Sequence, residues 1–327
     1  MKKPMGALAV LTYLNIACLL LVLLVETVVA ERRWWGTLLT YLPQQFFLVP
    51  SVLLLLIGLV RRRRLVMWGN LGALLIGLPV LVGVTIPWHF PPAGGVPVRV
   101  MTWNVSSMDW GADRVIAEIQ RERPDVVCLQ ELRVTESPRF LSMIRRAFPG
   151  WSQARGGEVV ILSRYPIIRQ SIYPVAGMRR AMVAAVVEVG GKRLTVIAVH
   201  FSTTLDGAPS LAKPKGSRRA YLRQTAVARS MQTRMLLDIA AQAGTPVVIA
   251  GDFNTPARGI FYHRIAGAYP DAFRVAGWGT GNTFPAKFPL LNIDHLFTSR
   301  DIAVRRCATR RTRASDHLPV VADLLAK

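Results

Sequence analysis

Long apolar runs set the first part of the chain apart from the rest. Three such runs contain no charged residue and cover residues 7–25, 34–60 and 65–88. A helix that crosses a membrane needs about 20 consecutive apolar residues, so residues 1–88 are predicted to form a membrane anchor with three transmembrane helices. Pro43 and Pro50 interrupt the second run, and its first turns are therefore expected to kink or to lie in the membrane interface.

From residue 98 onward the hydrophobic runs become short, β-branched and bounded by Gly, Pro, Asp or Asn. Such runs predict strands, at Val98–Trp103, Val126–Gln130, Val159–Ser163, Met182–Val189, Leu194–Val199, Val247–Ala250, Ile293–Thr298 and Val320–Leu324. Helices are predicted at Ala112–Arg121, Pro138–Ala147 and Tyr221–Ala241. Gly190 and Gly191 separate two strand-like runs, which predicts a hairpin. Residues 98–327 are therefore expected to form an α/β domain with two packed sheets, joined to the anchor by the Pro/Gly-rich linker 89–97.

Basic residues predict how the anchor is oriented. Lys2 and Lys3 precede the first apolar run, arginines fill positions 61–64 after the second, and Arg32 and Arg33 stand between the first two. The positive-inside rule then places the amino terminus and the 61–64 loop in the cytoplasm. The domain after the linker is expected outside the plasma membrane. The alternative that the first run is a cleaved signal peptide leaves this orientation unchanged.

The net charge of the chain indicates what kind of partner it binds. It has 41 basic and 19 acidic residues, hence a formal net charge of +22, and most of this lies in residues 97–327. A domain this basic is expected to attract phosphate-rich partners such as nucleic acid, anionic lipid or phosphorylated small molecules. The three cysteines, Cys18, Cys128 and Cys307, show neither metal-ligand spacing nor a disulfide framework and are expected to pack.

Polar residues of only four types, Asp, Glu, Asn and His, stand at or beside the ends of the predicted strands. They are Asn104, Glu131, His200, Asp252, Asn254, Asp294, Asp316 and His317. Function in α/β domains collects at strand ends and their loops. A carboxylate inside an apolar strand, as at Asp294, costs several kcal/mol unless it is paired. We therefore expect these side chains to share one site.

This set of side chains suits metal-assisted cleavage of phosphate esters. An oxygen-rich cluster around Glu131, with Asn104 and Asp316, favours Mg²⁺ or Mn²⁺ over zinc, which prefers sulfur and imidazole. Asp294 and His295 face opposite sides of a strand, so Asp294 is expected to orient His317, and His295 to pack.

The ordered motifs TWN, LQE, VH, GDFN, IDH and SDHLP resemble the endonuclease/exonuclease/phosphatase (DNase I-like) superfamily. The resemblance covers about residues 98–325. It implies a four-layer α/β/β/α sandwich with the site between the upper edges of the two sheets. Since no motif position departs from the pattern, an active enzyme is expected.

The resemblance also implies a role for each side chain. Glu131 would bind the metal, with Asn104 and Asp316 close by. Asp252 would orient or deprotonate the attacking water, Asn254 would contact the phosphoryl group, and His200 would stabilise the transition-state oxygens. His317, oriented by Asp294, would contact the scissile phosphate or act as acid and base. Whether His317 or Asp252 activates the water stays open, as does a choice between one metal and two.

Two loops bear on the substrate. The basic loop at 205–223 follows His200 and carries Lys213, Lys215, Arg218, Arg219 and Arg223. The loop before Asp294 carries Trp278, Phe284 and Phe288. With the expected membrane tether, they favour a lipid-linked phosphate, such as a phospholipid, sphingolipid or polyprenyl pyrophosphate. The alternatives are an extracytoplasmic DNA or RNA nuclease and, in another class, a non-catalytic membrane sensor.

Overall fold

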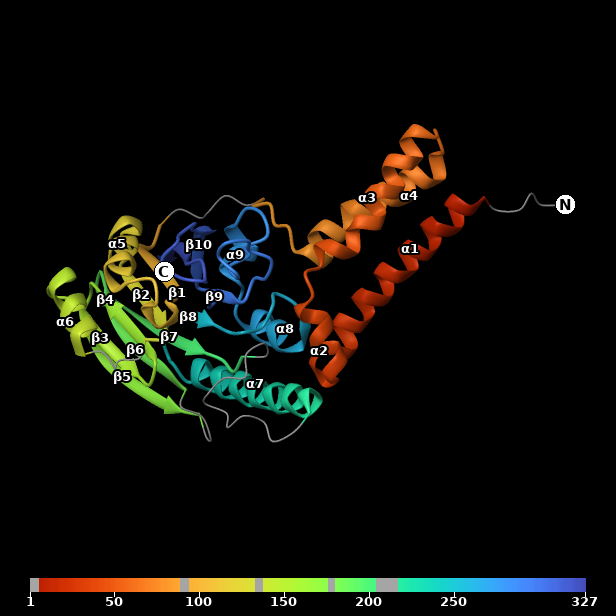
Figure 1. The fold of residues 1–327 in the computed structure, drawn as a ribbon. Helices are drawn as coiled ribbons and strands as arrows, with labels where there is room; N and C mark the ends of the chain where they lie inside the picture. The colour runs from red at the N-terminus through yellow and green to blue at the C-terminus, as the bar shows by residue number, and fades with distance from the viewer. Residues whose placement is uncertain (1–5, 89–93, 133–137, 176–179, 204–216) are drawn as a thin grey trace.

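A bundle of apolar helices stands beside a domain built on two β-sheets (Figure 1). The computed structural model describes residues 6–88, 94–132, 138–175, 180–203 and 217–327. The predicted linker therefore lies partly outside the described residues, and so does the basic loop predicted at 205–223, including Lys213 and Lys215. Its remaining basic residues, Arg218, Arg219 and Arg223, lie in a helix, so the prediction of a loop is wrong for that part.

Each sheet combines parallel and antiparallel strands. The first has the order β10 (Ile302–Thr309), β11 (Val320–Ala326), β1 (Val96–Asn104), β2 (Val126–Gln130), β4 (Val159–Ser163) and β3 (Ser152–Gly156). The second has the order β5 (Ile167–Pro174), β6 (Ala181–Val189), β7 (Lys192–His200), β8 (Val247–Asp252) and β9 (Asp294–Thr298). The pairs β1–β2 and β7–β8 are parallel, so the carboxyl ends of the two strands in each pair meet at one edge.

The sheets and their helices make four layers. Alternate side chains of both sheets, such as Val100 and Val196, form a valine-rich core between them. The opposite face of the first sheet packs on α5 (Ala112–Glu122) and α6 (Pro138–Ala147), and that of the second on α7 (Arg218–Ala241) and α8 (Gly259–Ala268). The short helix α9 (Ala272–Ala276) closes one end of the central core. Because successive side chains of a strand point to opposite faces of the sheet, their position along the strand determines which layer they face.

The structure confirms the predicted strands and helices and adds others. The hairpin turn lies at Gly190 and Gly191, both with positive φ, between β6 and β7. The prediction missed β3, β5, β10, α8 and α9. All three missed strands are sheet edges, where exposed polar residues break the apolar pattern, and the two missed helices are short.

The predicted packing role of the cysteines holds for two of the three. Cys128 and Cys307 are buried in the central core of the domain. Cys18 is exposed on the surface of the helix bundle, so the prediction that it packs against other residues of the chain is wrong.

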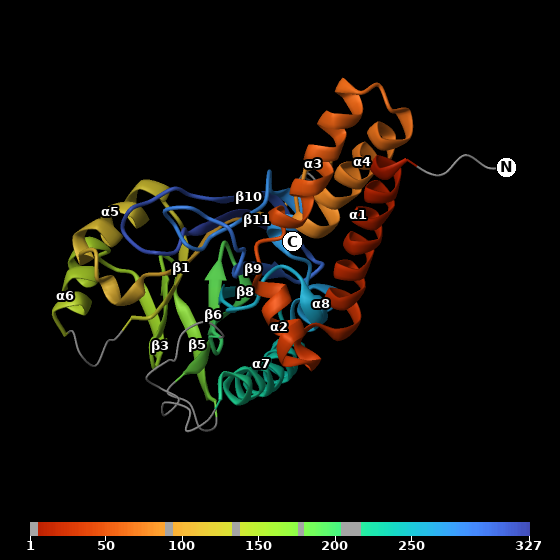
Figure 2. The ribbon, with the colours of Figure 1, turned by 45° about the vertical axis from the view of Figure 1, so that its right-hand side comes forward.

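The apolar runs form α1 (Ala7–Leu24), α2 (Trp34–Tyr41), α3 (Gln45–Val60) and α4 (Arg64–Gly77). Residues 7–32 and 64–82 are each long and apolar enough to cross a membrane, and α2 with α3 makes a third candidate span that is bent by 61°. The bend lies at Pro43, where the sequence predicted a kink, whereas Pro50 lies inside α3. Helix α2 lies against α7 of the domain, and residues 25–32, which precede α2, lie against α8 (Figures 1 and 2).

Polar side chains join the three long helices inside the bundle. The Asn15 carboxamide on α1 donates to the Ser51 hydroxyl on α3 at 2.8 Å and to the Asn70 carboxamide on α4 at 3.1 Å. Asn70 in turn donates to the Thr12 hydroxyl at 3.1 Å and is fully buried. Hydrogen bonds between helices of this kind hold helix bundles together in a lipid environment.

We expect Asn70→Leu to loosen the bundle, because it removes the residue that bonds to both Thr12 and Asn15. The loss should be about 1 kcal/mol, measured as resistance of the full chain to SDS unfolding in detergent. Leu75→Ala, at a position of the same helix that is 65% exposed, is the control. An equal effect of both variants would argue against the polar network.

Candidate active site

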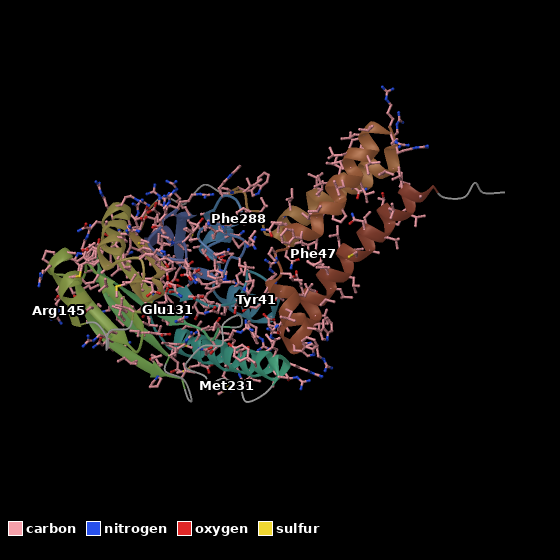
Figure 3. The ribbon with its side chains drawn as sticks, viewed as in Figure 1. Tyr41, Phe47, Glu131, Arg145, Met231 and Phe288 are labelled. Atoms are coloured by element: carbon pink, nitrogen blue, oxygen red, sulfur yellow. The ribbon has the colours of Figure 1, made fainter. Side chains whose placement is uncertain are left out.

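Two parallel strand pairs bring the predicted polar side chains to neighbouring sheet edges. Asn104 ends β1, and Glu131 follows β2, its parallel neighbour (Figure 3). In the second sheet His200 ends β7 opposite Asp252, which ends β8. Asp252 is also paired with Asp294, the first residue of β9. The strand register therefore places a row of His, Asp and Asp side by side.

The first group of ligands gathers around Asn104. Its carboxamide nitrogen donates to Glu131 Oε1 and to Asp252 Oδ2, both at 2.9 Å. His200 Nε2 lies 3.7 Å from Glu131 Oε1 and 3.6 Å from Asp252 Oδ2. One ligand atom from each of Glu131, His200 and Asp252 fits within 4.8 Å of the others. Asn104 thus holds two carboxylates from different sheets close together.

The GDFN turn presents both of its polar side chains to this group. The Asp252 carboxylate accepts the Asn254 backbone N–H at 2.8 Å, and the Asn254 carboxamide donates to the Phe201 carbonyl at 3.1 Å and to Asp252 Oδ2 at 3.3 Å. Asn254 has a φ of 44°, a left-handed conformation that Asn tolerates better than most residues. The Asn in the motif therefore serves the turn as well as the site.

A second group contains Asp252, Asp294 and His317, whose ligand atoms also lie within 4.8 Å of one another. His317 Nδ1 lies 2.8 Å from Asp294 Oδ2, as an oriented imidazole requires, and Nε2 lies 4.0 Å from Asp252 Oδ2. The Phe284 ring covers the imidazole at a centroid distance of 4.7 Å. Asp252 belongs to both groups and joins them.

The carboxylates set the proton affinity of His317. Burial alone would lower its pKa, but the charge of Asp294 and the hydrogen bond to it, with the charges of Asp252 and Asp316, raise the pKa to about 10. The charge of Asp316 therefore acts on His317, but Asp316 belongs to neither ligand group. Its backbone carbonyl accepts the Ala286 N–H at 2.6 Å.

His295, which the sequence predicts to pack, does so. Its Nε2 lies 2.9 Å from the Thr255 carbonyl, and the ring contacts Phe253, Tyr262 and Phe297. It faces away from the two ligand groups, as the alternation along β9 predicts.

Two supporting residues escaped the sequence analysis. Glu158, in the β3–β4 turn, places Oε1 2.7 Å from His200 Nδ1, and Arg180 lies 3.2 Å from the same carboxylate. Ser315 accepts the His317 backbone N–H at 3.1 Å and donates to the Asn104 carbonyl at 2.8 Å. In the sequence, Gly157-Glu158 has the pattern of an ordinary turn, and a Ser before Asp-His has that of an ordinary loop residue. Only the fold shows what these side chains contact.

The site has the donor set of a divalent cation. It offers carboxylate oxygens from Glu131 and Asp252 beside one imidazole nitrogen, which suits a hard cation with oxygen-rich coordination. Within the part of the chain that the structure describes, His200 Nε2 and Asp294 Oδ1 are buried without a hydrogen-bond partner. Unsatisfied buried groups of this kind call for a ligand.

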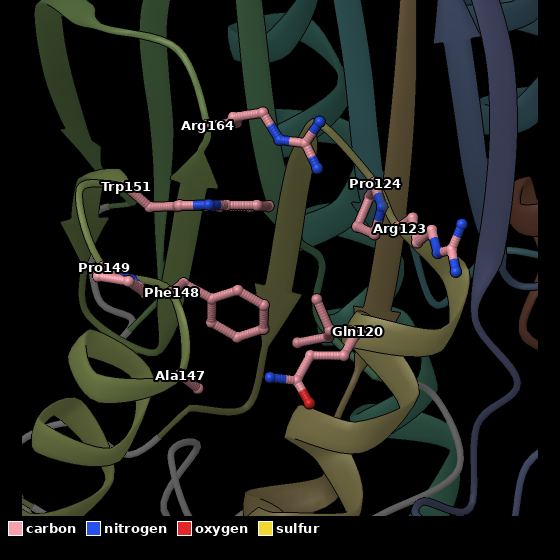
Figure 4. Close-up of a pocket in the computed structure, with 9 residues that line it drawn as sticks. Gln120, Arg123, Pro124, Ala147, Phe148, Pro149, Trp151 and Arg164 are labelled. Atoms are coloured by element: carbon pink, nitrogen blue, oxygen red, sulfur yellow. The ribbon is translucent and has the colours of Figure 1, made fainter.

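A separate pocket of about 360 Å³ lies between α5 and α6 and contains none of these residues (Figure 4). Trp151, Phe148 and Arg164 form part of its lining, and Arg164 lies 5.9 Å from the Trp151 ring. Its lining lacks the carboxylates and imidazoles that bind a cation or move a proton, so the chemistry is placed at the strand ends.

The sandwich fold and the His/Asp/Glu cluster together define a hydrolase of phosphate esters. The chain belongs to the Endonuclease/Exonuclease/phosphatase family, whose family model matches residues 101–317. A comparison with curated protein sequences gives no match.

Solved structures share the DNase I-like fold at low sequence identity. An endonuclease/exonuclease/phosphatase from Beutenbergia cavernae is 22% identical, with a TM-score of 0.54 over 71% of this chain and 72% of that one. A mannosyl-6-phosphatase from Bacteroides thetaiotaomicron is 16% identical, with a TM-score of 0.54 over 70% and 99%. D. rerio TDP2, complexed with a single-strand DNA product, is 17% identical, with a TM-score of 0.52 over 70% and 98%. These likenesses support the fold and leave the substrate open.

We expect Asp294→Asn to lower the pKa of His317 by about 1–3 pH units, since it removes an adjacent charge. Imidazole NMR of the metal-free full chain would measure this. Because the folded pKa of about 10 exceeds the ordinary 6.5, the stability from this pair is complete below pH 6.5 and is lost as the pH rises through 10. A pKa that stays near 10 in the variant would contradict the assignment.

Proposed function

We propose that the protein is a divalent-metal-dependent phosphoesterase that acts on a lipid-linked phosphate at the outer face of the plasma membrane. The observation that carries the chemistry is the place of Asp252 Oδ2. It lies 3.6 Å from His200 Nε2 in one ligand group and 4.0 Å from His317 Nε2 in the other. A water held between the two groups would be near both a cation and a proton-accepting side chain.

Glu131, His200 and Asp252 would hold a cation, with Mg²⁺ or Mn²⁺ as the expected metal. When bound, the cation would stabilise the negative charge that develops on the phosphoryl oxygens during the reaction. Asn104 keeps Glu131 and Asp252 together, and Asp294 fixes the orientation of the His317 ring. Asn254, whose carboxamide lies 3.3 Å from Asp252 Oδ2, would contact a phosphoryl oxygen. His200 would not, because its Nε2 would hold the cation and its Nδ1 lies 2.7 Å from Glu158. Asp252 is placed to take a proton from water, and His317, whose pKa of about 10 keeps the imidazole protonated at neutral pH, is placed to donate one.

The surroundings of the site favour a lipid substrate. Arg219, in the first turn of α7, lies 5.9 Å from the ring of Trp34 on α2, so positive charge adjoins an apolar helix. Trp278 is 74% exposed, and its neighbour Gly279 pairs with Thr85 at the exit of the last apolar helix. Phe288, 69% exposed, ends the turn that begins at Pro285, directly after Phe284, whose ring covers His317. Exposed aromatic rings beside membrane helices are typical of the lipid interface.

The deciding experiment offers the full chain, in detergent micelles, Mg²⁺ or Mn²⁺ with phospholipids, polyprenyl pyrophosphate, inositol phosphates and plasmid DNA. We expect hydrolysis of a lipid phosphate, loss of it with EDTA, and a decrease of about 10³-fold or more in Asp252→Asn. Asp323→Asn, in the strand β11 away from the site, is the charge-matched control. Cleavage of plasmid alone, with steep salt dependence, would identify a nuclease. No turnover with any substrate would favour the non-catalytic sensor.

We expect Phe288→Ser to slow hydrolysis of lipid in vesicles while leaving hydrolysis of a soluble phosphodiester unchanged. Burial of one aromatic side chain in the interface contributes about 1.5–3 kcal/mol, so vesicle activity should fall about tenfold or more. Ile168→Ser, on the edge strand β5 and 46% exposed, is the matched control. A parallel loss on both substrates would place Phe288 in catalysis or folding instead of at the lipid surface.

A further inference from the structure

The last residue of α2 reaches the back of the GDFN turn. Tyr41 is 7% exposed, and its hydroxyl donates a hydrogen bond to the backbone carbonyl of Asn254. From α7, Arg229 Nη1 donates to the same Tyr41 hydroxyl at 2.5 Å and to the same Asn254 carbonyl at 3.1 Å. It also reaches the Thr255 hydroxyl at 3.4 Å. Two side chains from outside the sheets therefore converge on one peptide group.

That peptide group belongs to the residue whose side chain faces the site. Asn254 bonds on one side to Tyr41 and Arg229, and on the other its N–H and carboxamide bond to Asp252. Its φ of 44° is uncommon for a residue with a side chain, and such conformations persist where the surroundings hold them. Fixing the carbonyl therefore fixes the direction of the carboxamide and of the Asp252 carboxylate.

The Tyr41 ring also contacts the other half of the site. It packs with Leu291 and Ile293, and with Phe284, whose ring covers His317. A single side chain of the apolar region thus supports both the turn that carries Asp252 and the loop that covers the imidazole.

Arginine is an unusual residue at a buried position whose side chain only packs against its neighbours. Arg229 is fully buried, and burying a guanidinium costs several kcal/mol unless charges and hydrogen bonds compensate for it. Its Cζ lies 5.5 Å from the ring of Tyr41 and 5.5 Å from that of Phe261. Its hydrogen bonds go to the Tyr41 hydroxyl and to the Asn254 and Thr255 oxygens, close to the reacting groups, and the charge of Glu31 also compensates for its burial.

We propose that Tyr41 and Arg229 are positioning residues for the active site, so that the membrane-anchor helix α2 completes the catalytic domain. The inference rests on the proposed phosphoesterase function. The two residues touch neither cation nor substrate and act by holding Asn254 and, through it, Asp252. The anchor then has a role in turnover besides attachment to the membrane.

The test compares Tyr41→Phe with the parent, both as the full chain in the same detergent with a soluble phosphodiester and Mn²⁺. Losing one buried hydrogen bond that aligns the site should lower kcat about tenfold. KM should change little, because substrate contacts remain. Mn²⁺ binding should weaken several-fold, since the Asp252 carboxylate loses its alignment. Arg229→Met should lower kcat as well, and the double variant should lose less than the product of the two single losses.

Two controls separate positioning from folding. Tyr13→Phe removes a hydroxyl from the same anchor at a position 49% exposed. Thr40→Val removes the buried hydroxyl next to Tyr41, which donates to the Thr37 carbonyl of the same helix at 2.7 Å. Both should keep kcat at the parental value. A Thr40→Val loss as large as that of Tyr41→Phe, or a Tyr41→Phe variant with parental kcat and Mn²⁺ affinity, would overturn the inference.

The Mn²⁺ titration also separates failure of this inference from failure of the proposed function. A parent chain that binds Mn²⁺ but hydrolyses no substrate would refute the phosphoesterase, and weaker Mn²⁺ binding in Tyr41→Phe alone would still support positioning. A parent that neither binds Mn²⁺ nor turns over would refute both.

Discussion

A buried negative charge at Asp252 is the constraint around which the site is arranged. Its carboxylate is 1% exposed, and such a charge is tolerated only where donors surround it. Those donors come from Asn104 in one sheet and from Asn254 in the turn, with two imidazoles close by. The site is therefore assembled across the two sheets, and neither sheet could form it alone.

Strand register explains how a chain with such dispersed ligands reaches this arrangement. Parallel pairing of β7 with β8 places His200 opposite Asp252, and antiparallel pairing of β8 with β9 adds Asp294. A shift by one residue would turn each of these side chains into the hydrophobic layers. The valine-rich core of the sandwich resists that shift, because the exchanged side chains would no longer fit the closely packed layers on the two faces of the sheet. The packing of the core thus maintains the geometry of the site.

Sequence reasoning found the strand-end residues because polarity at the end of an apolar run is a local signal. It also found the Asp294–His317 pair, since alternation along one strand assigns the faces. It missed Glu158, because that turn becomes relevant only when the β3–β4 hairpin is placed beside β7. It missed Tyr41 for a similar reason: a tyrosine at the end of an apolar helix looks like an ordinary interfacial residue, and its partner is 213 positions away. Contacts between separate parts of the chain leave no local pattern.

The pairing of β1 with β11 has a consequence for biosynthesis. Residues 96–102 pair with residues 320–326, so β1, which has β2 as its parallel neighbour on one side, acquires its second neighbour only when residues 320–326 have been synthesised. Until then β1 has an open edge, and partly made domains of this kind are prone to aggregate. The helices of the first part, by contrast, rely on local contacts and can form as soon as they emerge. Assembly therefore proceeds from the amino-terminal helices toward a sandwich that closes last.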